Sequence, residues 1–123
     1  CGAMNYNVLN PQTQRITAKQ LSKVDFSDVE HLNPLLDVRP RIQYDISHID
    51  GSINIPYDDL SRSKSVLEGL DPHKKTYVIC RFGNDSQLST KILLERNFED
   101  VKDVIGGLDS WKKDVNADFP SYW

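Results

Sequence analysis

An apolar run that ends on a cysteine is the feature that most constrains this chain. The sequence TYVI at residues 76–79 combines β-branched and aromatic side chains and predicts a central strand. Cys80 follows directly, and a helical pattern runs from Ser86 to Asn97. The stretch therefore predicts a strand–loop–helix unit with the cysteine at the carboxyl end of the strand.

The rest of the chain alternates short apolar runs with helical patterns. A polar helix or turn is expected within residues 39–56, and Thr17 is the expected N-cap of the first helix. Gly106 and Gly107 should turn the chain before the last helix. Further strands are expected at 34–38, 53–55 and 101–105, and further helices at 16–24, 57–71 and 108–115. This alternation favours one parallel sheet that is covered by helices on both faces.

Length and charge limit the class of protein. The 123 residues suffice for one domain, and a net charge of −3 provides no basic surface for nucleic acid or anionic membranes. No apolar run approaches the length of a membrane span, and no signal peptide is visible. We expect a tag remnant and N-terminal arm at 1–15 and a single cytoplasmic domain at 16–123.

Only one of the two cysteines is a candidate functional residue. Cys1 lies in CGAM, which reads like a vector scar, and is excluded from the functional argument. The remaining Cys80 can form neither a disulfide framework nor a zinc set, and the three histidines show no ligand spacing. We therefore expect no metal in this domain and a reduced thiol in the cytosol.

Two interpretations of Cys80 are open from the residues alone. It can be a small hydrophobe that closes a strand. Alternatively, the amides of the Gly83-containing loop and the positive end of the next helix face its sulfur, with Arg81 adding charge. Helix N-termini and nearby cations lower a thiol pKa from about 8.5, so this second interpretation predicts a stabilised thiolate.

Two flanking motifs resemble signatures of the rhodanese family. DVRPRIQYDISHIDGSINIP resembles the first, and VIGGLDSW resembles the second, Gly-Gly-x-x-x-Trp. With the Cys80 loop between them, the resemblance covers roughly residues 16–120. The chain departs from the family where Ser47 replaces the usual glycine, and where Gln43 or Asp45 stands for the acidic helix residue.

Within that family the chain is most similar to one group of enzymes. CRFGNDSQ and the terminal FPSYW resemble the C-terminal domains of eukaryotic adenylyltransferase–sulfurtransferases, which activate ubiquitin-like sulfur carriers. The resemblance implies a domain excised from a longer enzyme, with Trp123 as the native C-terminus. ATP and zinc would then belong to an upstream domain, and this domain would need no cofactor.

The resemblance implies an α/β rhodanese-like fold and a sulfurtransferase with a persulfide intermediate on Cys80. The carrier would accept the sulfur for tRNA thiolation or molybdopterin synthesis, and a cysteine desulfurase or another rhodanese would donate it. An acidic Asp85 at the end of the loop should disfavour thiosulfate. The implied active-site loop comprises Arg81, Phe82, Gly83, Asn84, Asp85 and Ser86.

Other motif residues have structural alternatives. Asp37 and Arg39 either brace the strand end as an ion pair or act directly, and His48 suits a structural role better than that of a base. Ser86 is expected to cap its helix, and Asn84 to hydrogen-bond within the loop. The aromatic residues Trp111, Phe119, Tyr122 and Trp123 are expected to pack, and the last three can also contact a partner.

Two rival functions remain. A cysteine phosphatase or arsenate reductase also has its cysteine in a strand–loop–helix unit, but it needs the motif Cys-x5-Arg. Counted from Cys80, the position of that arginine is occupied by Ser86. The other rival is a non-catalytic rhodanese-like module that binds a protein partner. Whether sulfur reaches Cys80 separates this module from an enzyme.

Overall fold

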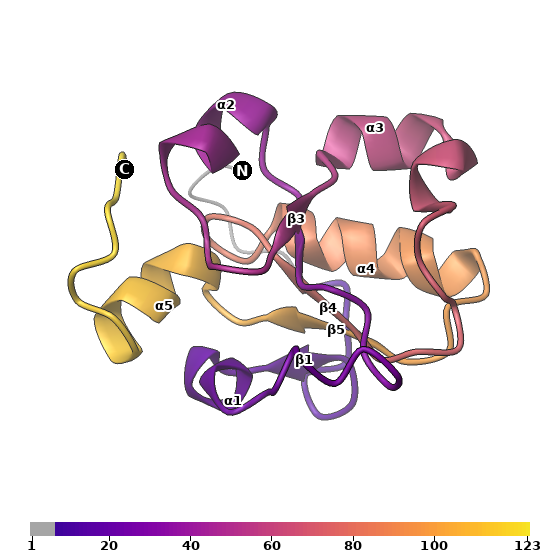
Figure 1. The fold of residues 1–123 in the computed structure, drawn as a ribbon, viewed down its shortest axis with the longest axis horizontal. Helices are drawn as coiled ribbons and strands as arrows, with labels where there is room; N and C mark the ends of the chain where they lie inside the picture. Colours follow the sequence, from indigo (N-terminus) through magenta and orange to yellow (C-terminus); the bar gives the residue numbers. More distant parts are fainter. Residues whose placement is uncertain (1–6) are drawn as a thin grey trace.

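Five parallel strands form the single sheet of the computed structural model, which describes residues 7–123. The strand order is β1-β5-β4-β2-β3, so β4 is central (Figure 1). The CGAM tetrapeptide with Cys1 lies outside the described residues. The strands are β1 (Arg15–Ile16), β2 (Leu36–Asp37), β3 (Ile53–Asn54), β4 (Thr76–Ile79) and β5 (Val101–Val104).

Helices cover both faces of the sheet, which confirms the predicted α/β class. Helices α3 and α4 lie on one face with the short 3-10 helix η1, and α1 and α5 lie on the other (Figure 1). The helices are α1 (Ala18–Ser22), α2 (Arg41–Ile46), α3 (Tyr57–Arg62), η1 (Lys64–Leu67), α4 (Asp85–Glu95) and α5 (Gly107–Asp114). Helix α2 follows β2 and buries none of its residues.

Alternation along the strands builds two hydrophobic cores. Leu36, Val78 and Cys80 pack into the core under α3 and α4. Leu35 and Ile79 point the other way, into the core under α1 and α5. Successive side chains of a strand face opposite sides, so the position of Cys80 two residues after Val78 directs its sulfur toward α4.

Most predicted elements are present with shorter bounds. The N-cap at Thr17 is confirmed, because its hydroxyl accepts from the amide of Gln20 and the Gln20 side chain accepts from the amide of Thr17. The helix expected at 57–71 instead divides into α3 and η1. Helix α4 ends before Asn97, whose φ of 69° lies in the left-handed region that ends many helices.

Strand β1 was not predicted. Arg15 and Ile16 pair in parallel with Asp103 and Val104 of β5, and Leu9 is buried nearby in the sequence. The expected boundary between an arm and the domain therefore falls inside a strand. Two residues are too few to show the alternation by which a strand is recognised.

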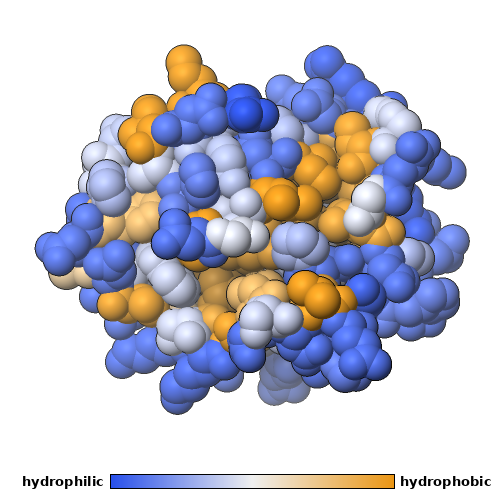
Figure 2. Space-filling model, viewed as in Figure 1, coloured by the Kyte–Doolittle hydropathy of each residue, from blue (hydrophilic) through white to orange (hydrophobic). Residues whose placement is uncertain are grey.

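The surface is mostly hydrophilic, with apolar residues gathered in patches toward the middle of one face (Figure 2). Two of the exposed apolar residues, Ile42 and Ile46, lie on α2. Within residues 7–123, no helix combines the length and apolar character that a membrane crossing needs.

Candidate active site

Cys80 follows the central strand β4 directly and begins the loop to α4. Strands β2 and β5 flank β4 on either side, so the loop emerges from the middle of the carboxyl edge of the sheet. This edge is where open parallel sheets bind ligands. Only 1% of the Cys80 surface is exposed. The position agrees with the predicted strand–loop–helix unit.

Polar groups of its own loop and helix contact the sulfur. The Gly83 amide donates to Sγ at 3.1 Å, and the thiol donates to Oγ of Ser86 at 3.4 Å. Burial raises the pKa of the Cys80 thiol above its ordinary value, and the charge of Asp85 acts in the same direction. The backbone amides of Ser86 and Gly83, which hydrogen-bond to the sulfur, oppose this rise in pKa without overcoming it.

The predicted fall in the thiol pKa is therefore wrong for the protein at rest. The sequence indicated loop amides and a helix N-terminus, both of which favour a thiolate, but it did not show how completely the sulfur is enclosed. Desolvation is the larger effect at a group that is 1% exposed. Cys80 consequently rests as a thiol at neutral pH and must lose a proton before it attacks as a nucleophile.

Two glycines bring other backbone close to the loop. Gly83 has a φ of +90°, and a Cβ there would lie 2.8 Å from the amide nitrogen of Gly106. Gly107 also has a positive φ, and a Cβ there would collide with the carbonyl oxygen of Cys80. The first turn of α5 supports the same loop, since the amides of Leu108 and Asp109 donate to the carbonyls of Cys80 and Arg81.

The remaining loop residues differ in their burial and contacts. The Arg81 guanidinium lies 4.6 Å from the centroid of the Phe82 ring, which in turn meets Trp123 edge-on. Asn84 is buried and occupies the N-cap position of α4. Asp85 begins α4, is half-buried and lines a surface pocket with Arg41 of α2.

Ser86 does not cap α4, which corrects the sequence-based expectation. It lies inside the first turn, is fully buried, and donates from Oγ to Oδ2 of Asp103 at 2.7 Å. The Arg15 guanidinium pairs with the same carboxylate, with Nε 2.7 Å from Oδ1. A second nitrogen of Arg15 donates to the Gly83 carbonyl at 3.2 Å.

Sequence reasoning missed Asp103 and Arg15. One signal was present, because strand periodicity places Asp103 on the same face as Val101, which packs in the core under α4. An acidic residue at such a position needs a buried partner. Nothing in the sequence indicated that the partner would come from a two-residue strand 88 positions away.

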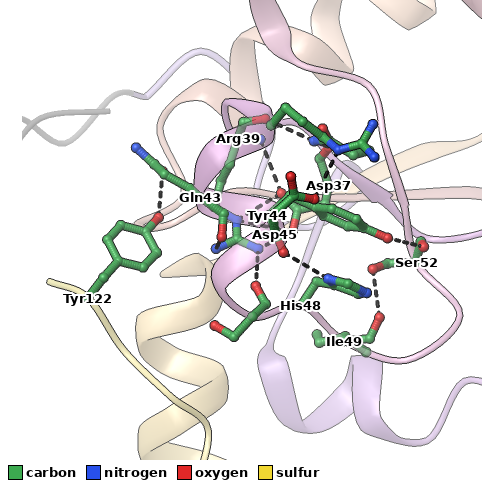
Figure 3. A network of polar contacts seen from close by, with 12 residues as sticks. Asp37, Arg39, Gln43, Tyr44, Asp45, His48, Ile49, Ser52 and Tyr122 are labelled. Atoms are coloured by element: carbon green, nitrogen blue, oxygen red, sulfur yellow. Dashed lines mark hydrogen bonds and ion pairs between the residues drawn. The ribbon is translucent and has the colours of Figure 1, made fainter.

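Asp37 and Arg39 form a buried ion pair in which Nη2 of Arg39 lies 2.6 Å from Oδ2 of Asp37. Arg39 also donates to the carbonyls of Gln43 and Ser47, which ties the end of β2 to α2 (Figure 3). Burial lowers the pKa of Arg39, but Asp37 and, to a smaller extent, Tyr122 outweigh it, so the net pKa is raised. These contacts favour the bracing role over a direct one.

His48 belongs to the same framework. Its Nδ1 lies 2.8 Å from the carbonyl oxygen of Tyr44, and its ring stacks on the Tyr44 ring with centroids 3.8 Å apart (Figure 3). The contacts match those of a structural histidine. The aromatic tail packs as expected, because Phe119 is buried and the Trp123 indole donates to Asp109 of α5.

Comparison with known proteins identifies the family of this domain. The family model described as the rhodanese-like domain matches residues 17–114, so the chain belongs to the rhodanese-like domain family. A rhodanese-related protein from Thermoplasma volcanium superposes with a TM-score of 0.66 at 29% identity, covering 87% of this chain and 95% of that one. The predicted family is therefore confirmed.

Curated relatives confirm the finer resemblance. The protein "Adenylyltransferase and sulfurtransferase uba4" of Ogataea parapolymorpha is 44% identical over 99% of this chain, and its namesake in Candida albicans is 37% identical over 99%. The chain spans 29% and 28% of the length of these two relatives.

Two glycines provide a matched test of loop crowding. Gly51 and Gly83 have similar positive φ values, 84° and 90°, but a Cβ at Gly51 meets nothing within 4 Å. Gly51→Ala should lower the free energy of unfolding by about 1–2 kcal/mol, the cost of the left-handed backbone. Gly83→Ala should lower it by at least about 1 kcal/mol more, because backbone must also move. Urea unfolding of both variants measures the difference; equal losses would show that the loop has room.

Proposed function

We propose that this chain is a sulfurtransferase domain that accepts sulfane sulfur on Cys80 as a persulfide. The observation that carries the proposal is the enclosure of the Cys80 sulfur at the carboxyl edge of the sheet, with the Gly83 amide donating to it at 3.1 Å. A nucleophile in such a loop suits covalent transfer. The printed names of the curated relatives, which include sulfurtransferase, support the same reaction.

The reaction balances without a redox partner. The Cys80 sulfur attacks the terminal sulfur of a donor persulfide, the donor S–S bond breaks, and the donor leaves as a thiolate that takes up a proton. Cys–SH and R–S–SH thus become Cys–S–SH and R–SH. The backbone donors of residues 81–85 would stabilise the terminal sulfur of the new persulfide as an anion.

The acceptor in this proposal is the activated C-terminus of a ubiquitin-like sulfur-carrier protein. It rests on the resemblance to relatives that are named adenylyltransferase and sulfurtransferase. A cysteine desulfurase or another rhodanese would supply the sulfur. The products would serve tRNA thiolation, molybdopterin synthesis or both, in the cytoplasm.

The two rivals fit the site less well. A phosphatase needs an arginine at the position of Ser86, where the structure has a buried hydroxyl bonded to Asp103. A non-catalytic binding module needs no buried thiol with oriented donors. The loop geometry therefore favours the enzyme.

Sulfur loading tests the central claim. After incubation with a cysteine desulfurase and cysteine, the wild-type chain should gain the mass of one sulfur, which cyanide or reductant removes. In a Cys1→Ser background, which leaves Cys80 as the sole thiol, Cys80→Ala should fold and gain nothing, because covalent transfer needs a thiol. Intact-mass spectrometry measures both, with Cys1→Ser as the matched cysteine control that still gains sulfur. A sulfur adduct that persists in Cys80→Ala would refute the assignment.

The carrier should reach the loop through its C-terminal tail, because only a narrow, extended segment can approach an enclosed sulfur. An NMR titration with a ubiquitin-like carrier should shift the amide signals of residues 81–86 and of the Gly106–Gly107 turn. Binding of the carrier to this domain alone should be weak. In a longer enzyme an adenylation domain would tether the carrier and raise its effective concentration at the loop, so a high direct affinity would not be needed. The same carrier without its tail is the control; shifts confined to the α1 face would contradict the proposal.

Asp85 should direct donor choice away from thiosulfate. A unit charge about 5 Å from the reacting sulfur is worth roughly 3 kcal/mol at an effective dielectric near 20, and even about 1.4 kcal/mol is tenfold in rate. Asp85→Arg should therefore raise thiosulfate:cyanide activity at least several-fold, mostly through the thiosulfate concentration dependence. Added salt should shrink the gain.

The matched control for this charge reversal is Asp28→Arg. Asp28 is exposed and pairs with His31, outside the Cys80 loop, and its reversal changes the net charge equally. Thermal unfolding of both variants separates activity from stability, because Asp85 lies in the first turn of α4. If a folded Asp85→Arg uses thiosulfate no better than Asp28→Arg, the electrostatic account of donor choice is wrong.

A further inference from the structure

Asp103 is a buried carboxylate near the reacting sulfur, and the sulfur transfer described above assigns it no role. It lies on β5, next to β4, the strand that Cys80 follows, and none of its surface is exposed. A buried charge is costly unless it is paired, and Arg15 of β1 pairs with it through two hydrogen bonds. Ser86 donates a third hydrogen bond to this carboxylate, and its hydroxyl also contacts the Cys80 sulfur.

A continuous chain of hydrogen bonds runs from the Cys80 sulfur through Ser86 to the Asp103 carboxylate. The Cys80 thiol donates to Ser86 Oγ at 3.4 Å, and Ser86 Oγ donates to Asp103 Oδ2 at 2.7 Å. A hydroxyl has one proton, and an ionised carboxylate can only accept. The proton of Ser86 therefore points at Asp103, and its lone pairs face the thiol. This polarity suits the movement of a proton away from sulfur.

We propose that Ser86 and Asp103 form a proton relay that withdraws the Cys80 thiol proton when the sulfur donor arrives. The inference rests on the proposed sulfurtransferase function. Ser86 is the catalytic member, because it touches the reacting sulfur, and Asp103 is a positioning residue that acts through Ser86 and receives the displaced proton.

The proton and electron pairs balance at each atom. The Cys80 S–H bond breaks and its proton binds Ser86 Oγ, while the original Ser86 proton binds Asp103 Oδ2. The freed sulfur electron pair forms the bond to the terminal sulfur of the donor persulfide, and the donor S–S pair departs with the leaving thiolate. Asp103 then returns its proton along the same path or to solvent, and the leaving thiolate takes one up.

The charges around the relay suit this exchange. Burial raises the pKa of Asp103 above its ordinary value, against the hydrogen bonds from Arg15 and Ser86 and the charge of Arg15, so the carboxylate is a better proton acceptor than an exposed one. Proton transfer moves the negative charge to Sγ, where the Gly83 amide receives it. Arg15 faces the relay from β1 and Asp85 from α4, where Asp85 raises the pKa of the thiol.

A purely structural role for Asp103 makes the opposite prediction. If the carboxylate only anchors β1 and α4 to β5, its negative charge near the sulfur hinders thiolate formation. Removing the charge in Asp103→Asn would then leave sulfur uptake unchanged or make it faster. A relay instead makes uptake slower in Asp103→Asn, and also in Ser86→Ala, where the Asp103 charge remains.

The test compares rates across pH in a Cys1→Ser background, so that Cys80 is the sole thiol. Single-turnover sulfur uptake from cysteine persulfide is followed by quenched mass spectrometry between pH 6 and pH 9. Asp103→Asn and Ser86→Ala should be about 100-fold slower than the parent at pH 7, a typical loss for general-base catalysis. The ratio to the parent should recover as rising pH ionises the thiol without help. Ser86→Thr keeps a hydroxyl and should keep the parental profile.

Alkylation of Cys80 by iodoacetamide is measured on the same variants, because it needs the same deprotonation but no sulfur transfer. The relay predicts the same pH-dependent ratios there, even if the parent gains no sulfur, which would refute the proposed function alone. Where Asp103→Asn fails to fold, Ser86→Ala carries the test. Ratios to the parent that stay near one, or do not change with pH in either reaction, would overturn the relay.

Discussion

The enclosure of the Cys80 sulfur is the constraint on which the rest of the site depends. A sulfur that is 1% exposed loses the water that would stabilise its anion, so protein groups must supply the compensation. The Gly83 amide supplies part of it, and this contact requires a loop turned tightly enough for a left-handed glycine. The loop is in turn seated on the first turn of α5, which explains why Gly107 has no room for a side chain.

Two ion pairs, each with a buried carboxylate, hold the parts of this edge in place through different contacts. Asp37 and Arg39 join the end of β2 to α2 through local contacts within ten residues. Arg15 and Asp103 join the outermost strand β1 to β5, and Arg15 also reaches the Gly83 carbonyl in the Cys80 loop. The second pair therefore links the stability of the sheet edge to the geometry of the active-site loop, which local pairing alone cannot do.

Local patterns predicted the central strand, the loop and α4 because each is formed by contiguous residues. The β-branched run at 76–79, Gly83 and the helical spacing after Ser86 needed no distant partner to be recognised. The prediction was wrong where the outcome depends on what surrounds a residue. Ser86 has a good capping side chain but turns inward to Asp103, and the pKa of Cys80 is raised because other elements cover it.

Periodicity and short motifs were enough to predict the α/β class, the family and the identity of the one candidate nucleophile among the described residues. The protonation of that nucleophile and the partners of its sulfur depend instead on how distant segments pack. Arg15, Cys80, Ser86 and Asp103 come from two strands, a loop and a helix, and they meet because β1, β5 and β4 are neighbours in the sheet. Desolvation and long-range hydrogen bonds arise only when such segments pack together, so no local pattern can encode them.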